Sequence, residues 1–77
     1  MRIFLGGHLN FYHPKKAKWL VVDLDEGSMP LARLLDDAGI PLKEVHLVAI
    51  NGEVIDLQDA VVSEGDEVKV FSAVGGG

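Results

Sequence analysis

The sequence predicts an α+β domain in which one helix packs against a small mixed sheet. Short segments of alternating apolar and polar residues recur along the chain, separated by Gly, Pro and Asn, which is the pattern of strands and turns. One segment among them repeats its apolar residues at helical spacing and has boundary residues at both ends. The 77 residues predict one small domain, with little core to spare for a buried active-site cavity.

The first two strands are predicted to form an antiparallel hairpin. Residues 2–12 are expected to be extended, with a bend at Gly6-Gly7. Residues 19–24 are rich in strand-forming side chains and form the second strand. The polar residues 13–17 lie between the two segments and provide the connection.

The helix is predicted at about residues 29–38. Ser28 is expected to cap its N-terminus, with Pro30 in the first turn, where the missing N–H costs nothing. Gly39 suits the left-handed position that ends a helix, and Ile40 is expected to fold back onto the last turn. The residues that form the apolar stripe are Leu31, Leu34, Leu35 and Ala38.

The second half of the chain predicts three further short strands. Residues 45–50 form an apolar strand, and Asn51-Gly52 predicts a tight type I′ turn into residues 53–57. Residues 59–62 suggest a single helical turn, and residues 67–71 form the last strand.

The faces of the outermost strands follow from their alternation. Val68 and Val70 lie on one face of the last strand and Phe71 lies on the other. In the first strand, Phe4 and Ile3 likewise point to different faces. If the first and last strands pair at the centre, four to five strands form a mixed sheet on one helix. That arrangement is the β-grasp fold.

Composition narrows the classes of function. The net charge of −5 disfavours nucleic acid and anionic membranes as partners, and a basic region on a partner protein suits it better. The chain has no cysteine, and its three histidines match no zinc-binding spacing, so no metal site is expected. No apolar run approaches the ~18 residues of a membrane span, and no targeting segment is recognisable, so we expect a cytoplasmic protein.

Three motifs in order resemble the MoaD/ThiS family of ubiquitin-like sulfur carriers. They are Val48-Ala49-Ile50-Asn51-Gly52-Glu53, then Gly65-Asp66-Glu67-Val68, then the C-terminal glycines, and the resemblance extends over essentially the whole chain. It implies a ubiquitin-like β-grasp fold. It also implies that the last glycine is adenylated by a ubiquitin-activating-type enzyme and then converted to a thiocarboxylate that delivers sulfur.

By this resemblance the reacting residue is Gly77, which follows the required Gly76. Gly75 is an extra glycine relative to the usual pair, and we expect it to contribute to partner binding. We expect the chain to divide into a β-grasp domain over residues 1–74 and a flexible tail over residues 75–77. Glycine lacks Cβ, which allows the tail to enter a narrow channel. The resemblance implies that the carrier binds no cofactor itself and that its activating partner uses ATP.

The main interpretation is sulfur donation in molybdopterin or tungstopterin synthesis, to a molybdopterin synthase large subunit. Molybdopterin-synthase small subunits usually have a Pro-Pro-Val-like stretch where this chain has Ser72-Ala73-Val74. The alternatives are sulfur donation to a thiazole synthase in thiamine synthesis, protein modification through the same tail, and a non-catalytic interaction module. No nucleophile, base and orienting group can be assembled from the sequence, so the chain is not expected to be an enzyme.

A partner-binding surface is expected on the open face of the sheet. Period-2 alternation places Phe4 and Phe71 there together. Trp19 and Val21 extend the same apolar area. Exposed apolar area on so small a domain is typical of a binding surface.

Overall fold

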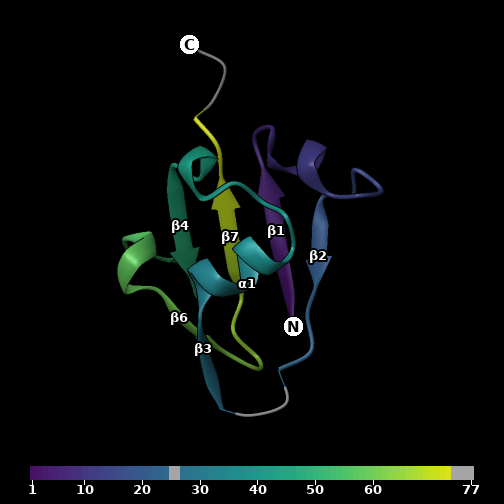
Figure 1. The fold of residues 1–77 in the computed structure, drawn as a ribbon. Helices are drawn as coiled ribbons and strands as arrows, with labels where there is room; N and C mark the ends of the chain where they lie inside the picture. Colours follow the sequence, from purple (N-terminus) through teal and green to yellow (C-terminus); the bar gives the residue numbers. More distant parts are fainter. Residues whose placement is uncertain (25–26, 74–77) are drawn as a thin grey trace.

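The computed structural model describes residues 1–24 and 27–73. Its main sheet has the strand order β2-β1-β7-β4-β5 (Figure 1). The bounds of these strands are β1 Arg2–Gly6, β2 Trp19–Val21, β4 Leu47–Ile50, β5 Glu53–Val54 and β7 Val68–Phe71. β1 and β7 pair in parallel and the other neighbours pair antiparallel. The predicted β-grasp arrangement, with the first and last strands together at the centre, is confirmed.

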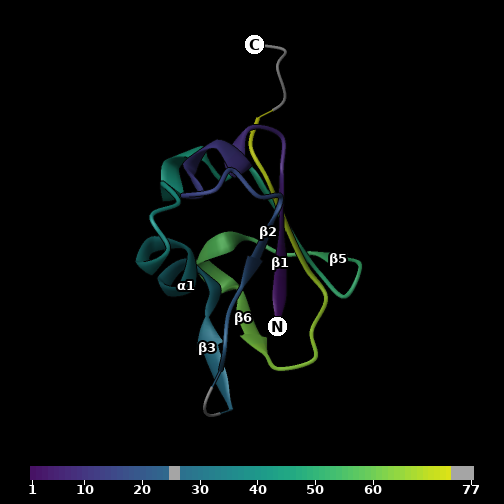
Figure 2. The same cartoon turned by 90° about the vertical axis from the view of Figure 1, so that its right-hand side faces the viewer.

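One helix, α1 (Leu31–Asp37), covers one face of this sheet (Figure 2). Leu31 and Leu35 are fully buried against the sheet, and Ile3, Leu5 and Val70 are buried from the opposite side. These residues confirm the predicted helical stripe and the predicted inner face of the sheet.

The predicted start of the helix is wrong. Ser28–Pro30 forms a short strand, β3, which pairs antiparallel with β6 (Val61–Ser63), and Ser28 makes no capping hydrogen bond. The first helical N–H, that of Leu31, donates instead to the carbonyl of Ala60 (3.0 Å). A carbonyl from a distant segment thus satisfies a donor that a cap would otherwise satisfy. The helical turn expected over residues 59–62 is shifted toward the N-terminus, to a 3₁₀ turn at Leu57–Asp59.

The predicted end of the helix is confirmed. Gly39 has a φ of +83°. The N–H of Ile40 donates to the carbonyl of Leu35 (2.9 Å), and the N–H of Gly39 donates to that of Asp36 (3.0 Å). This is the Schellman pattern, and Ile40 is buried at its end. A 3₁₀ turn at Leu42–Glu44 then leads into β4.

The predicted extended segment over residues 2–12 is also wrong beyond Gly6. Gly7 takes a φ of +64°, which turns the chain away from the sheet. Leu9–Tyr12 then forms a 3₁₀ turn, in which Leu9 is fully buried. Burial of this one apolar side chain holds the connection to β2 against the core.

The two turn motifs of the family resemblance meet at one end of the sheet. The Asn51 side chain donates to Asp66 Oδ1 (3.0 Å) and accepts from the N–H of Glu67 (2.9 Å). The N–H of Ser63 donates to Asp66 Oδ2 (2.8 Å). The hydrogen bonds from Asn51 and from Ser63 lower the pKa of Asp66 below its ordinary value of 3.8. Asn51 also has a positive φ (53°), followed by Gly52 (83°), as the predicted type I′ turn requires.

Candidate functional site

The end of the sheet opposite to these turns is where the chain leaves β7. The register pairs Ile50 with Val68 at the turn end and Leu47 with Phe71 at the exit end. Ser72 is buried after Phe71, and Ala73, the last described residue, is exposed. Gly75, Gly76 and Gly77, and the predicted domain boundary at residue 74, lie outside the described residues.

Two glycines accommodate the residues that precede the tail. A Cβ atom on Gly6 would overlap the ring of Phe71, and one on Gly7 would overlap the hydroxyl of Ser72. The N–H of His8 donates to Ser72 Oγ (2.7 Å), and the N–H of Ser72 lies 3.4 Å from the carbonyl of Gly6. The bend at Gly6-Gly7 therefore fixes the direction in which the chain leaves the domain.

The sequence analysis predicted this bend. It did not predict that the bend leaves space for Phe71 and Ser72, or that Ser72 is hydrogen-bonded to the domain. The information needed to predict this contact is the pairing of β1 with β7, which places Gly6 opposite Phe71. Once that register is known, the need for a residue without a side chain at position 6 follows from the size of the aromatic ring.

The face of the sheet that α1 does not cover has an aromatic cluster. The rings of Phe4 and Phe71 lie 5.9 Å apart, and those of Phe4 and Trp19 lie 5.1 Å apart in an edge-to-face arrangement. The guanidinium of Arg2 lies 4.6 Å above the ring of Trp19. Both phenylalanines are partly buried, because each ring covers its neighbours. The structure thus places Phe4 and Phe71 together on the open face.

Exposed aliphatic side chains extend this cluster across the sheet. Val21 is 70% exposed beside it on β2, and Val54 is 66% exposed at the far edge. We call the whole area the outer-face patch; it comprises Phe4, Trp19, Val21, Leu47, Val54 and Phe71. Lys69 lies on the same face, between Phe4 and Ala49. Exposed apolar side chains gathered on one face of a small domain are typical of a protein-binding surface.

The histidines have ordinary structural surroundings. His8 stacks on Phe11 with the ring centroids 5.8 Å apart, and His13 Nδ1 accepts from the N–H of Lys15 (3.0 Å). His46 lines a shallow groove of about 270 Å³ between β4 and the segment after β5. Across residues 1–24 and 27–73, no three potential metal ligands cluster. The same residues contain no helix long and apolar enough to cross a membrane.

The geometry suits presentation of a tail and docking of a protein. Ser72 is hydrogen-bonded to the domain at the exit, and the outer-face patch includes Phe71, the residue before it. A partner that covers the patch is thereby placed next to the emerging chain.

Comparisons with known proteins agree with this arrangement. A model of the ThiS family matches residues 15–77. The chain is also similar to the crystal structure of the thiamine biosynthesis protein ThiS from Geobacter metallireducens. The two sequences are 26% identical, the comparison covers 100% of each chain, and the TM-score is 0.58. No curated protein matches the chain.

The family match extends over most of the chain, and the similarity in structure includes its full length. ThiS-type proteins are small sulfur carriers, not catalysts, and work with an adenylating enzyme and a sulfur-accepting synthase. Because the family model matches more than half of the chain, this chain belongs to the ThiS family of sulfur carriers.

Proposed function

We propose that this chain is the sulfur carrier of thiamine thiazole synthesis. The observation that supports this pathway is the similarity to a thiamine biosynthesis protein over the full length of both chains. The family model and the solved structure both favour ThiS over the molybdopterin carriers. The thiazole alternative from the sequence therefore replaces molybdopterin as the preferred pathway.

The proposed chemistry takes place at the carboxylate of Gly77. That carboxylate attacks the α-phosphorus of ATP in the partner, pyrophosphate leaves, and an acyl-adenylate forms. A sulfur nucleophile at the oxidation level of sulfide then attacks the acyl carbon, AMP leaves with the bonding electrons, and a thiocarboxylate remains. The chain needs no bound cofactor, because the adenylating enzyme binds the ATP.

The carrier contributes binding, through the outer-face patch and the glycine tail. Ordering a flexible tail costs about 1–2 kcal/mol per residue, which docking of the folded domain must offset. Phe4 and Phe71 are the proposed aromatic anchors, since aromatic side chains at interface centres often contribute about 2 kcal/mol or more. Gly75 and Gly76 allow the backbone to enter a narrow channel.

The test begins with the chain produced together with its adenylating enzyme. Intact mass should show a fraction in which one oxygen is replaced by sulfur, and deletion of Gly77 should abolish this fraction. Thermal unfolding should not change, because an exposed terminus contributes little to stability. A full thiocarboxylate yield from the shortened chain would refute the carrier chemistry.

The pathway is tested separately with the purified thiocarboxylate. It should be consumed by a thiazole synthase and not by a molybdopterin synthase large subunit. The opposite preference would restore the molybdopterin interpretation, and an isopeptide bond to lysine would favour protein modification.

A further inference from the structure

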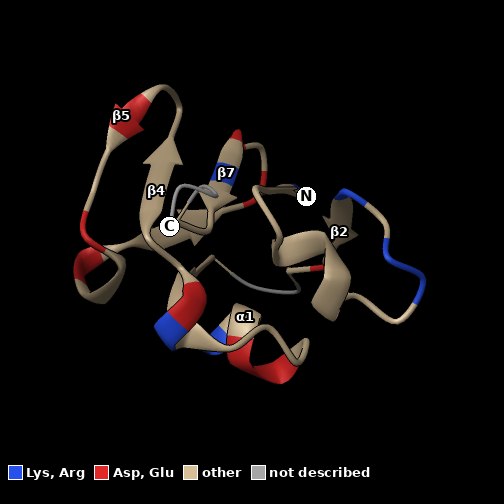
Figure 3. Ribbon diagram, turned by 90° about the horizontal axis from the view of Figure 1, so that it is seen from above, with Lys and Arg blue, Asp and Glu red and all other residues tan. Residues whose placement is uncertain are grey.

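The charge of the chain is distributed very unevenly. Residues 1–22 contain four basic residues and no acidic residue, whereas all twelve acidic residues lie from Asp23 onward. Three of the four basic residues, Lys15, Lys16 and Lys18, lie in the connection between β1 and β2. Viewed from above, this connection has basic segments without acidic ones, while acidic segments occur on α1 and β5 (Figure 3). The net charge of −5 therefore conceals a basic surface.

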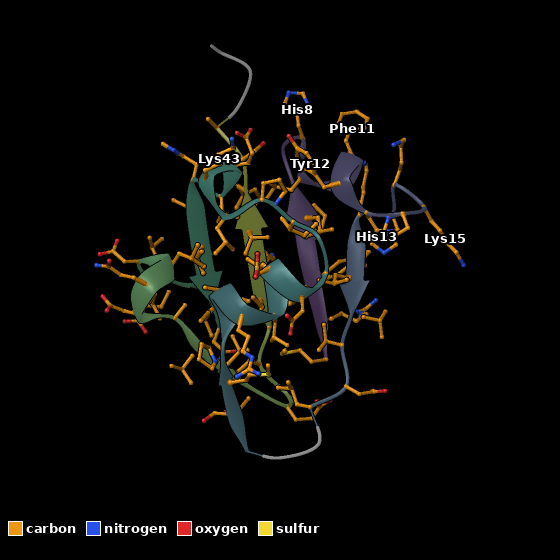
Figure 4. The ribbon with its side chains drawn as sticks, viewed as in Figure 1. His8, Phe11, Tyr12, His13, Lys15 and Lys43 are labelled. Carbon is orange, nitrogen blue, oxygen red and sulfur yellow. The ribbon has the colours of Figure 1, made fainter. Side chains whose placement is uncertain are left out.

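We call residues 8–18 the basic loop, and it also exposes aromatic rings. Phe11 is 56% exposed and Tyr12 is 43% exposed. Figure 4 shows both on the exit end of the molecule, with Lys15 projecting away from the domain. In the described part of the chain the one ion pair joins the Met1 amino group to Glu64, so none of these lysines forms an ion pair with a described carboxylate.

Hydrogen bonds within the basic loop connect its two halves. Asn10 Nδ2 donates to the carbonyl of Lys16 (3.2 Å), and Lys16 Nζ donates to the carbonyl of Phe11 (3.3 Å). Leu9 anchors the loop in the core. A surface that is already ordered loses less entropy on binding, so exposed rings on it are effective contacts.

The first end of the basic loop contacts the tail exit, and its last residue is bonded to β1, the strand next to β7. The N–H of His8 is bonded to Ser72 Oγ (2.7 Å), and the carbonyl of Lys18 accepts from the N–H of Leu5 (2.7 Å). The four residues that follow Ala73 can extend at most about 14 Å. Any enzyme that adenylates the last residue must therefore approach this end of the domain closely.

From these observations we propose that the basic loop is a second docking surface, which binds an acidic segment on the adenylating enzyme. The inference rests on the proposed function, because that function requires an enzyme to approach the exit. Lysines without an ion pair favour binding to a segment of clustered carboxylates, and Phe11 and Tyr12 provide apolar contact beside the lysines. Residues 8–14 precede the residues that match the family model.

The test is the association rate of the full chain with its adenylating enzyme. Lys15→Glu should slow association at least about threefold at low salt, and the difference should shrink at high salt, where charges are screened. Arg33→Glu, on the exposed side of α1, changes the net charge equally and should leave the rate unchanged. Phe11→Ala should speed dissociation about tenfold without altering the urea unfolding midpoint.

Equal rates for Lys15→Glu and the wild type, or equal slowing by Arg33→Glu, would overturn the proposal. Phosphatidylserine vesicles and a single-stranded RNA are the other probes: binding that Lys15→Glu abolishes would assign the loop to lipid or nucleic acid instead. Pyrophosphate release is measured in parallel. If the wild type associates but releases no pyrophosphate, the proposed function is refuted, while the effect of Lys15→Glu on association can still be measured. If the wild type does not associate with the enzyme, both the proposed function and the basic-loop proposal are overturned.

Discussion

Replacing Phe71 by alanine separates docking from folding at the outer-face patch. Full burial of a phenylalanine contributes about 1.5–3 kcal/mol, and the partly buried ring of Phe71 should account for about 1.5 kcal/mol of it. The tilted contact with Phe4 adds about 0.5 kcal/mol. We therefore expect the free energy of unfolding to fall by about 2 kcal/mol, and the affinity for the adenylating enzyme to fall by about thirtyfold or more.

Urea unfolding and titration calorimetry measure the two effects on the same protein. Val61→Ala is the matched control, since Val61 is an exposed apolar residue on β6, outside the outer-face patch. It should change neither quantity by more than about 0.5 kcal/mol. Unaltered affinity in a folded Phe71→Ala would show that the partner docks elsewhere. A stability loss above about 4 kcal/mol would show that Phe71 belongs to the core.

Three further changes test the fold and the exit. Leu35→Ala should lower the free energy of unfolding by about 2–5 kcal/mol, because Leu35 is fully buried; a loss below about 1 kcal/mol in urea would contradict its placement. Gly7→Ala should lower the free energy of unfolding by about 2 kcal/mol, because its φ is +64° and a Cβ would overlap Ser72. The thiocarboxylate yield should fall as well, and unchanged stability and yield would refute a role for the bend. The lowered pKa of Asp66 predicts stability that is present above pH 3.8 and lost as the pH falls through the folded-state pKa; Asp66→Asn should weaken this loss, and an identical pH profile would count against it.

Local patterns were sufficient for the elements that are determined by nearby residues. The end of the helix depends on Gly39 and Ile40, which are adjacent, and the hairpin turn depends on Asn51-Gly52. The inner and outer faces of β1 and β7 follow from alternation alone, which is why Phe4 and Phe71 were placed on the correct face.

The elements that were predicted wrongly depend on partners far away in the sequence. Ser28–Pro30 has the residues of a helix start, but it becomes a strand because Val61–Ser63 pairs with it. Residues 8–12, the first part of the basic loop, were expected to be extended, whereas Leu9–Tyr12 forms a 3₁₀ turn and Leu9 is buried in the core. Long-range pairing of this kind leaves no local pattern.

The candidate site was predictable in part for the same reason. The positions of Phe4 and Phe71 in the outer-face patch follow from alternation. The space that Gly6 and Gly7 leave for Phe71 and Ser72 can be predicted only when the parallel register is known. The basic loop was hidden because the net charge averages its lysines with acidic residues elsewhere.

The position of β7 has a consequence for the order of folding. This strand is the last in the chain, yet it lies between β1 and β4, and the pair Ile3–Val68 joins residues near opposite ends of the sequence. Without β7 the two halves of the main sheet share no strand, and a chain that stops short of it lacks the buried side chains of Val68 and Val70. Formation of the sheet therefore requires the same strand that leads into the tail. An adenylating enzyme that recognises the outer-face patch would then accept completely folded carriers and reject truncated ones.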